Sequence, residues 1–160
     1  MPKLFYWPAT CSITIRIILE EAGLSYQDEL VDLGAKQQLS ADFLNINPKG
    51  KIPAFLRDDD ALLTEVPAIA LWLALTNPQA ALIAADLDTR IRTIEILDYI
   101  AGTIHMQGAA RAWRPAGFNE NEAAHEAIRA RGKSIVLKGL DILSQTLERH
   151  AVHVNRMAAP

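Results

Sequence analysis

Residues 3–23, KLFYWPATCSITIRIILEEAG, place a short apolar and aromatic run directly before a helical pattern. The run from Lys3 to Trp7 predicts a buried strand. From Cys11 onward, apolar residues recur at the i, i+3, i+4 and i+7 spacing of one helix face: Ile15, Ile18, Leu19 and Ala22. Gly23 follows as a natural helix stop. The stretch therefore predicts a strand–helix unit whose junction carries the one cysteine of the chain.

The segments that follow complete a small α/β domain. Tyr26 to Asp32 is a second strand candidate, and two parallel strands joined by a helix form a βαβ unit. Residues 40–47, SADFLNIN, predict a short helix that opens on a serine, a common N-cap residue. Two runs separated by the turn residues DDD, Pro53 to Arg57 and Ala61 to Thr64, predict a hairpin. With a helix over residues 65–76 that carries no charge after Glu65, the predicted order is βαβαββα.

The second half of the chain has only helical periodicity. One face comprises Ile94, Leu97, Ala101 and Ile104, and another comprises Ile128, Ile135, Leu143 and Leu147. Gly132 and Gly139 lie on or beside the second face, where small residues let a neighbouring backbone approach closely. We therefore predict a first domain over residues 1–77, a linker over 78–88 and a partial all-α domain over 89–160.

Charge and composition restrict the classes of partner. The 160 residues include 16 basic and 19 acidic side chains, which gives a net charge of −3. Nucleic acid and anionic membranes both require a basic patch, so neither is expected as the main partner. Half of the residues are hydrophobic, which is enough for a sizeable core.

The number of cysteines and the hydropathy pattern indicate the cellular compartment. A single cysteine excludes an internal disulfide and a cysteine-based zinc cluster, and we expect no metal. It also suits a reducing cytoplasm, and no signal peptide pattern is visible. Val66 to Ala85 is uncharged and about long enough to span a membrane, but its centre, TNPQ, is typical of a turn. We therefore expect a buried helix followed by a linker, and no membrane span.

The position of Cys11 allows two interpretations. At the first turn of a helix, a thiol faces unpaired backbone N–H groups and the positive end of the helix dipole. Both favour the thiolate, so the pKa of Cys11 is expected to lie below the free value of about 8.5. Alternatively, the cysteine is a buried and inert small hydrophobic residue.

Two further motifs describe a ligand. In NPKGKIP, residues 47–53, a cis bond before Pro53 would expose the backbone N–H and C=O of Ile52 to an extended peptide. In TEVPAI, residues 64–69, a helix start could receive a carboxylate and Glu65 could receive an amine. A ligand with an α-amino acid head, a peptide middle and a thiol would reach all three places. Glutathione has this chemistry.

The same stretches resemble a known family. Four stretches occur in the order and at the spacing of glutathione transferases, closest to the bacterial beta class. They are KLFY…P…CS, VDL…K, NPKGKIPAF and LLTE…AI…WLA. TIEILDYIAGTIH, residues 93–105, resembles the first helix of the family's all-helical second domain. The resemblance implies a thioredoxin-like first domain that binds glutathione.

Roles follow from this resemblance residue by residue. Cys11 matches a cysteine beside the glutathione sulfur, and His105 matches a histidine near it. The positions that match glutathione contacts are Lys36 at the glycyl end, Ile52 with cis-Pro53 at the peptide, and Glu65 with Val66 at the γ-glutamyl head. Further contact positions are Asp98, Gly102, Thr103 and Ile104. Without the resemblance, His105, Lys36 and Glu65 would be interpreted as ordinary surface residues.

The sequence also departs from the family pattern. Residue 66 is usually glycine or serine, and Val66 keeps the backbone N–H but lacks a hydroxyl. Family members usually continue with more helices, which help to form the electrophile pocket. The resemblance therefore implies a shortened C-terminal domain, of natural origin or from an altered reading frame.

Two functions are expected from these observations. The first is a cytoplasmic, homodimeric transferase in detoxification that conjugates glutathione, its co-substrate, to a hydrophobic electrophile. A variant of this function is monothiol exchange through a mixed disulfide at Cys11. The second is a non-catalytic glutathione-binding or assembly module that has lost the electrophile pocket.

Overall fold

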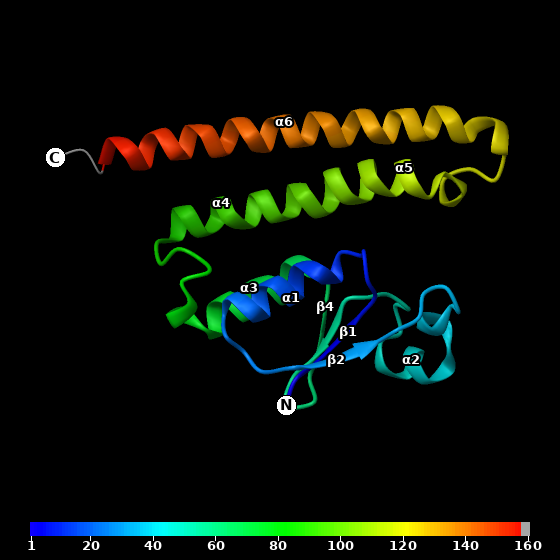
Figure 1. Cartoon of the computed structure of the whole chain (residues 1–160), viewed down its shortest axis with the longest axis horizontal. Coiled ribbons are helices and arrows are strands. Elements are labelled where there is room, and N and C mark those ends of the chain that lie inside the picture. The colour runs from blue at the N-terminus through cyan, green and yellow to red at the C-terminus, as the bar shows by residue number, and fades with distance from the viewer. Residues whose placement is uncertain (158–160) are drawn as a thin grey trace. The chain divides into compact units, whose positions relative to one another are not determined.

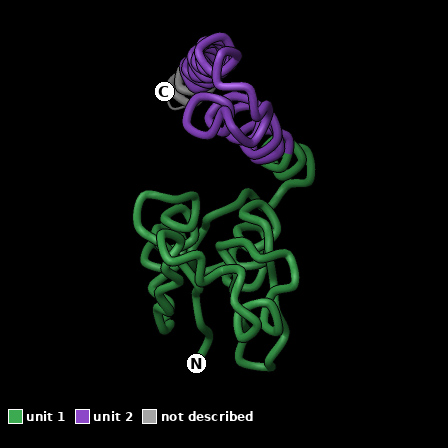
Figure 2. The backbone as a smooth tube through the Cα atoms, turned by 90° about the vertical axis from the view of Figure 1, so that its right-hand side faces the viewer, with its two compact units in different colours: residues 1–94 green, residues 95–160 purple. Residues whose placement is uncertain are grey.

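The computed structural model describes the backbone of residues 1–157 and the side chains of residues 1–149. The chain forms two compact units, residues 1–94 and residues 95–160 (Figure 2). The predicted domain and linker boundaries remain a prediction.

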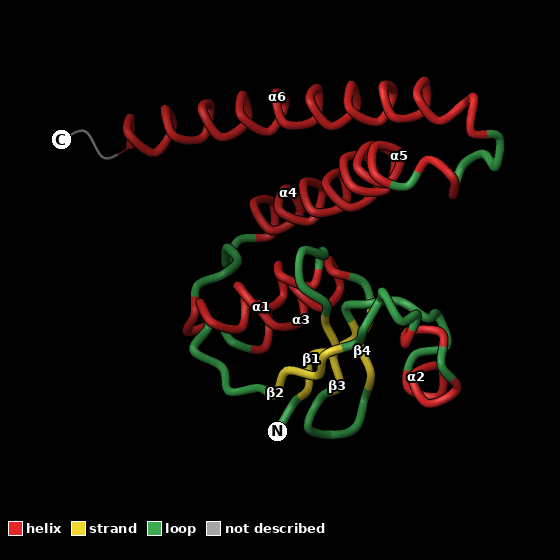
Figure 3. The backbone as a smooth tube through the Cα atoms, turned by 45° about the vertical axis from the view of Figure 1, so that its right-hand side comes forward, coloured by secondary structure: helices red, strands yellow, loops and turns green. Residues whose placement is uncertain are grey.

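A mixed sheet forms the centre of unit 1 (Figure 3). Its strands are β1 (Lys3–Tyr6), β2 (Gln27–Leu30), β3 (Ala54–Leu56) and β4 (Leu62–Thr64), in the spatial order β2-β1-β3-β4. β1 is parallel to β2, and β3 is antiparallel to both β1 and β4. The predicted βαβ unit and hairpin are therefore confirmed, although each strand is shorter than the predicted run.

Helices cover both faces of this sheet (Figure 3). α1 (Ser12–Glu21) and α3 (Val66–Thr76) pack on one face, and α2 (Ala41–Ile46) packs on the other. Successive strand residues point to opposite faces, so neighbouring residues of β1 join different cores. Leu4 packs with Ile15, Leu19, Phe55, Ile69, Ala70 and Leu73. Phe5 packs with Val31, Phe43 and Ala54.

Local signals set the ends of these helices. Gly23, with a φ of 63°, follows the end of α1, as predicted. The Ser40 hydroxyl accepts a hydrogen bond from the backbone N–H of Phe43 at 3.2 Å, which confirms the predicted cap of α2. α3 ends at Thr76, where the Asn77 side chain donates to the Leu73 carbonyl at 2.9 Å. Over the described residues, no helix is long and apolar enough to cross a membrane.

Unit 2 is helical, as predicted. α4 (Leu87–Asp98) begins in unit 1 and enters unit 2 at residue 95, and it continues into η3 (Tyr99–Ala109), which is π-helical, and then into α5 (Ala110–Trp113). Short 3-10 turns, η4 (Pro115–Gly117) and η5 (Glu122–Ala124), lead to the long α6 (His125–Met157). α6 runs beside η3 and α5 (Figure 1).

Glycines bring these helices together. A Cβ atom at position 132 would lie 2.6 Å from the backbone oxygen of Gly108, and one at position 139 would lie 2.5 Å from Ile104 Cγ1. The predicted close approach of a neighbouring backbone is therefore confirmed at Gly132, whereas Gly139 makes room for the Ile104 side chain. The prediction for Leu147 is wrong, because its side chain is 70% exposed. Leu147 follows Gly139 by eight residues, which turns it about 80° around α6 from the packed face.

Candidate functional site

Cys11 lies at the junction of β1 and α1. It is the residue before the first turn of α1, and its carbonyl accepts a hydrogen bond from Thr14 N at 3.2 Å. The partly buried Sγ lies 3.9 Å from the Ile52 carbonyl oxygen, within range for the thiol to donate a hydrogen bond. The structure thus joins two of the predicted site residues that are far apart in the sequence.

Hydroxyl groups hold the loop before α1. The buried Ser12 hydroxyl donates to the Trp7 carbonyl at 3.2 Å and lies 2.7 Å from the Thr10 hydroxyl. Thr10 Oγ1 also donates to the Trp7 carbonyl, at 2.8 Å. These bonds fix the backbone that carries Cys11. Sequence reasoning had no direct signal for this network, because serine and threonine in a loop are common.

The NPKGKIP motif forms the predicted turn before β3. The buried Asn47 side chain donates to the Lys51 carbonyl at 2.7 Å and accepts from the Lys49 N–H at 3.2 Å. The Ile52–Pro53 bond is cis, as the resemblance implies, and Pro53 is buried. The turn therefore presents the Ile52 carbonyl toward Cys11.

Glu65 occupies an uncommon backbone conformation at the start of α3. Its φ is 70° and its ψ is 125°. A positive φ is unfavourable for a residue with a Cβ atom, and such residues are found preferentially at functional sites. The first turn of a helix also has backbone N–H groups without intrahelical partners. Among the first three residues of α3, Val66 and Ala68 have a backbone N–H to offer, whereas Pro67 has none.

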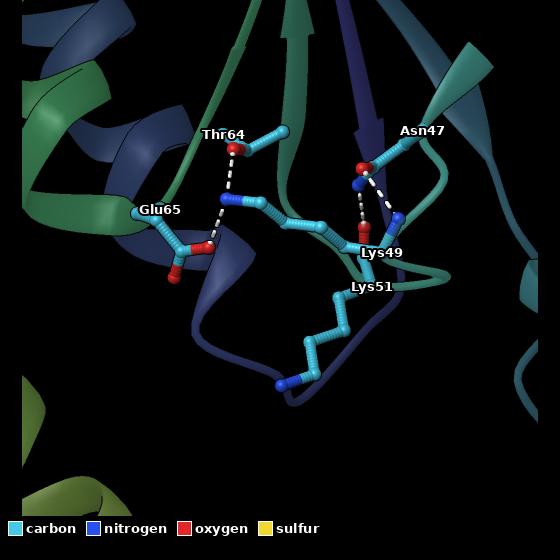
Figure 4. Close-up of polar contacts among 5 residues, drawn as sticks. All are labelled: Asn47, Lys49, Lys51, Thr64 and Glu65. Atoms are coloured by element: carbon cyan, nitrogen blue, oxygen red, sulfur yellow. Dashed lines mark hydrogen bonds and ion pairs between the residues drawn. The ribbon is translucent and has the colours of Figure 1, made fainter.

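A lysine that sequence reasoning missed binds this glutamate (Figure 4). Lys49 Nζ lies 2.7 Å from Glu65 Oε1 and 2.8 Å from Thr64 Oγ1. The nearby Lys51 side chain points away from both groups. The contact spans 16 residues of sequence and depends on the β3–β4 hairpin, so no local pattern could reveal it. A lysine in a polar turn is more often solvated.

Lys36 lies apart from these groups. It precedes the 3-10 turn η1 (Gln37–Leu39) with a φ of 57°, and its side chain is exposed. Over residues 1–149, the structure describes no contact that joins Lys36 to the other predicted site residues.

The remaining predicted residues belong to unit 2. Asp98 is exposed at the end of α4, and Gly102, Thr103, Ile104 and His105 follow one another in η3. The Ile104 side chain is buried against Gly139, so it serves the packing of unit 2. Burial, and then the positive charge of Arg114, lower the pKa of the half-buried His105 below its usual value. Its imidazole is therefore neutral at pH 7, the form that can accept a proton.

Unit 1 thus combines groups that suit a thiol-bearing peptide. They are a thiol at a helix start, a backbone carbonyl beside it, and a carboxylate at the start of a second helix. Within the described residues, no cluster of three or more histidine, cysteine or acidic side chains could hold a metal ion.

Known proteins share both the sequence and the fold. The family "Glutathione S-transferase, N-terminal domain" matches residues 2–75. The glutathione S-transferase GstA of Escherichia coli is 42% identical over 115 residues, which cover 71% of this chain and 57% of that protein. The chain spans about half the length of the first curated relatives that it matches.

Solved structures extend the comparison into unit 2. A glutathione transferase homologue from Sulfitobacter with bound glutathione has a TM-score of 0.82 at 31% identity, over 89% of this chain and 68% of that chain. The beta class glutathione S-transferase of Sphingomonas chungbukensis has a TM-score of 0.74 at 32% identity, over 91% of this chain and 69% of that chain.

Proposed function

Because the chain belongs to the glutathione S-transferase family, with a thioredoxin-like first domain and a helical second domain, we propose that it binds glutathione through unit 1. We further propose that the protein transfers the glutathione sulfur to a hydrophobic electrophile. The observation that carries the proposal is the approach of Cys11 Sγ to the Ile52 carbonyl at 3.9 Å. It places a helix-start thiol beside the backbone that would pair with the peptide.

Each end of glutathione has a partner in this proposal. The backbone of Ile52, before Pro53, pairs with the cysteinyl residue, so the ligand sulfur lies near Cys11. Glu65 binds the amine of the γ-glutamyl head, and the N–H of Val66 binds its carboxylate. Lys36 pairs with the glycyl carboxylate in an exposed contact, which is worth little energy.

The roles proposed for residues of unit 2 rest on the family resemblance. We assign contact positions to Asp98, Gly102 and Thr103, and to the backbone of Ile104, whose side chain packs inside unit 2. The imidazole of His105, which its lowered pKa keeps in the neutral form, is the proposed acceptor for the proton of the glutathione thiol. The domain assignment that goes with this proposal is a glutathione-binding domain over residues 1–77, a linker over 78–88 and a helical domain over 89–160.

The proposed reaction is a nucleophilic substitution. The thiolate of glutathione attacks an electrophilic carbon, the S–C bond forms, and the bond to the leaving group breaks with its electron pair. The proton goes to His105 or to water. Thiol–disulfide exchange is the related alternative: the Cys11 thiolate attacks a disulfide that contains glutathione, a mixed disulfide forms at Cys11, and the other half of the disulfide leaves as a thiolate.

Location and assembly belong to the same proposal. A thiol-dependent enzyme with one cysteine suits the reducing cytoplasm.

We also propose a homodimer, because the apolar side chains of Leu87 and Ile91 are 68% and 52% exposed. Light scattering tests the dimer, and a mass near 17.6 kDa would show a monomer.

A conjugation assay tests the transferase directly. The protein is mixed with glutathione and chlorodinitrobenzene, and the absorbance of the thioether product is followed. We expect a rate above the uncatalysed reaction that saturates with glutathione. Glutathione binding without this rate enhancement would instead support the non-catalytic module.

A further inference from the structure

The Lys49–Glu65 contact suggests how the site distinguishes between ligands. Resting on the proposed binding of the γ-glutamyl head at Glu65, we propose that Lys49 makes this end of the site selective for a complete α-amino acid group. In this role, Lys49 releases Glu65 to the ligand's amine and pairs with the ligand's α-carboxylate. A ligand with the amine alone would lose this second contact.

The geometry places both charges at the start of α3. Lys49 Nζ is 2.7 Å from Glu65 Oε1 and is also held by Thr64 Oγ1 at 2.8 Å (Figure 4). The two side chains are 52% and 62% exposed, so a ligand can reach them and an exchange of partners is not blocked by packing. The threonine hydroxyl can keep the ammonium near the helix start after Glu65 has changed partner.

The ion pairs that form and break on binding explain the expected selectivity. An incoming amine takes the place of the Lys49 ammonium on the carboxylate, so one cation replaces another and little attraction is gained. The displaced ammonium then lies beside the bound amine, and like charges repel. An α-carboxylate on the same carbon as the amine removes this cost, because it gives Lys49 a new partner.

The start of α3 increases the need for such a cation. Pro67 has no N–H, and Val66 has no side-chain donor. The helix start therefore offers few hydrogen bonds to a carboxylate, and Lys49 supplies a charge-assisted one.

Two variants and two ligands test the proposal. Lys49→Met removes the ammonium and keeps much of the apolar stem, and Lys51→Met is the matched control on the same turn. The ligands are glutathione and γ-aminobutyryl-cysteinylglycine, which has the amine and lacks the α-carboxylate. Calorimetry gives the four affinities of the variants and the two of the unaltered protein. Thermal unfolding confirms that each variant is folded.

We expect Lys49→Met to leave glutathione binding within about threefold of its unaltered value, because the lost contact with the α-carboxylate is offset by the release of Glu65. The same change should strengthen the binding of the analogue, because its amine no longer competes with Lys49 for Glu65, so the preference for glutathione falls. Lys51→Met should preserve the preference. An unchanged preference for glutathione in Lys49→Met would overturn the proposal. If the unaltered protein binds neither ligand, the proposed function fails as well.

Discussion

Replacing Gly132 with alanine is expected to lower the free energy of unfolding of unit 2 by roughly 1–3 kcal/mol, the range for overpacking. The new Cβ atom would lie 2.6 Å from Ala112 N and 2.6 Å from Gly108 O. Both are backbone atoms, so no side-chain rotation relieves the overlap. α6 must move away from η3 and α5, which opens contacts along the whole helix pair.

Gly117→Ala is the matched control for this substitution. No heavy atom outside its own chain neighbours lies within 4 Å of the corresponding Cβ position, so a change in stability of a few tenths of a kcal/mol is expected. Denaturant unfolding followed by far-UV circular dichroism gives both values. Equal stability of the two variants would mean that α6 does not approach the η3 backbone at Gly132.

Replacing Glu65 with alanine is expected to weaken glutathione binding by about tenfold or more. In the proposed complex, Glu65 forms a charge-assisted hydrogen bond with the ligand's amine, and such bonds contribute roughly 1.5–3 kcal/mol. Lys36→Ala removes an exposed cation and should cost about 0–1 kcal/mol. The two variants remove side-chain charges of opposite sign from unit 1, so comparing them separates a specific contact from a general electrostatic effect.

Calorimetric titration with glutathione measures both losses. A larger loss for Glu65→Ala than for Lys36→Ala supports the placement of the γ-glutamyl head at the start of α3. Equal losses, or no loss for Glu65→Ala, would count against that placement.

Local patterns predicted most of unit 1 correctly. The first buried strand, the Ser40 cap and the stop at Gly23 each depend on neighbours within a few residues, so the sequence displays them directly. The same holds for the thiol at the start of α1. Gly132 and Gly139 were recognisable because small residues on an apolar helix face have few other uses.

Long-range contacts and changes of helical period were not predictable in this way. Lys49 reaches Glu65 because a hairpin brings two turns together, and nothing in either turn alone specifies the pair. The π-helical backbone of η3 was missed because an apolar stripe such as that ending at Ile104 suits several helical periods. Leu147 was grouped with Ile128, Ile135 and Leu143 on one helix face. The positions of these residues turn gradually around the axis of α6, which leaves Leu147 exposed.

In the proposed complex, glutathione binds along the Cys11, Ile52 and Glu65 edge of unit 1. Amide NMR spectra of the full chain, recorded during titration with millimolar glutathione, report binding at each of these residues. We predict saturable shifts for the amides of Cys11, Ile52, Glu65 and Val66. We predict no comparable shifts for Leu24 and Asn77, which follow the opposite ends of α1 and α3. An unchanged spectrum, or shifts concentrated at those opposite ends, would contradict binding along this edge.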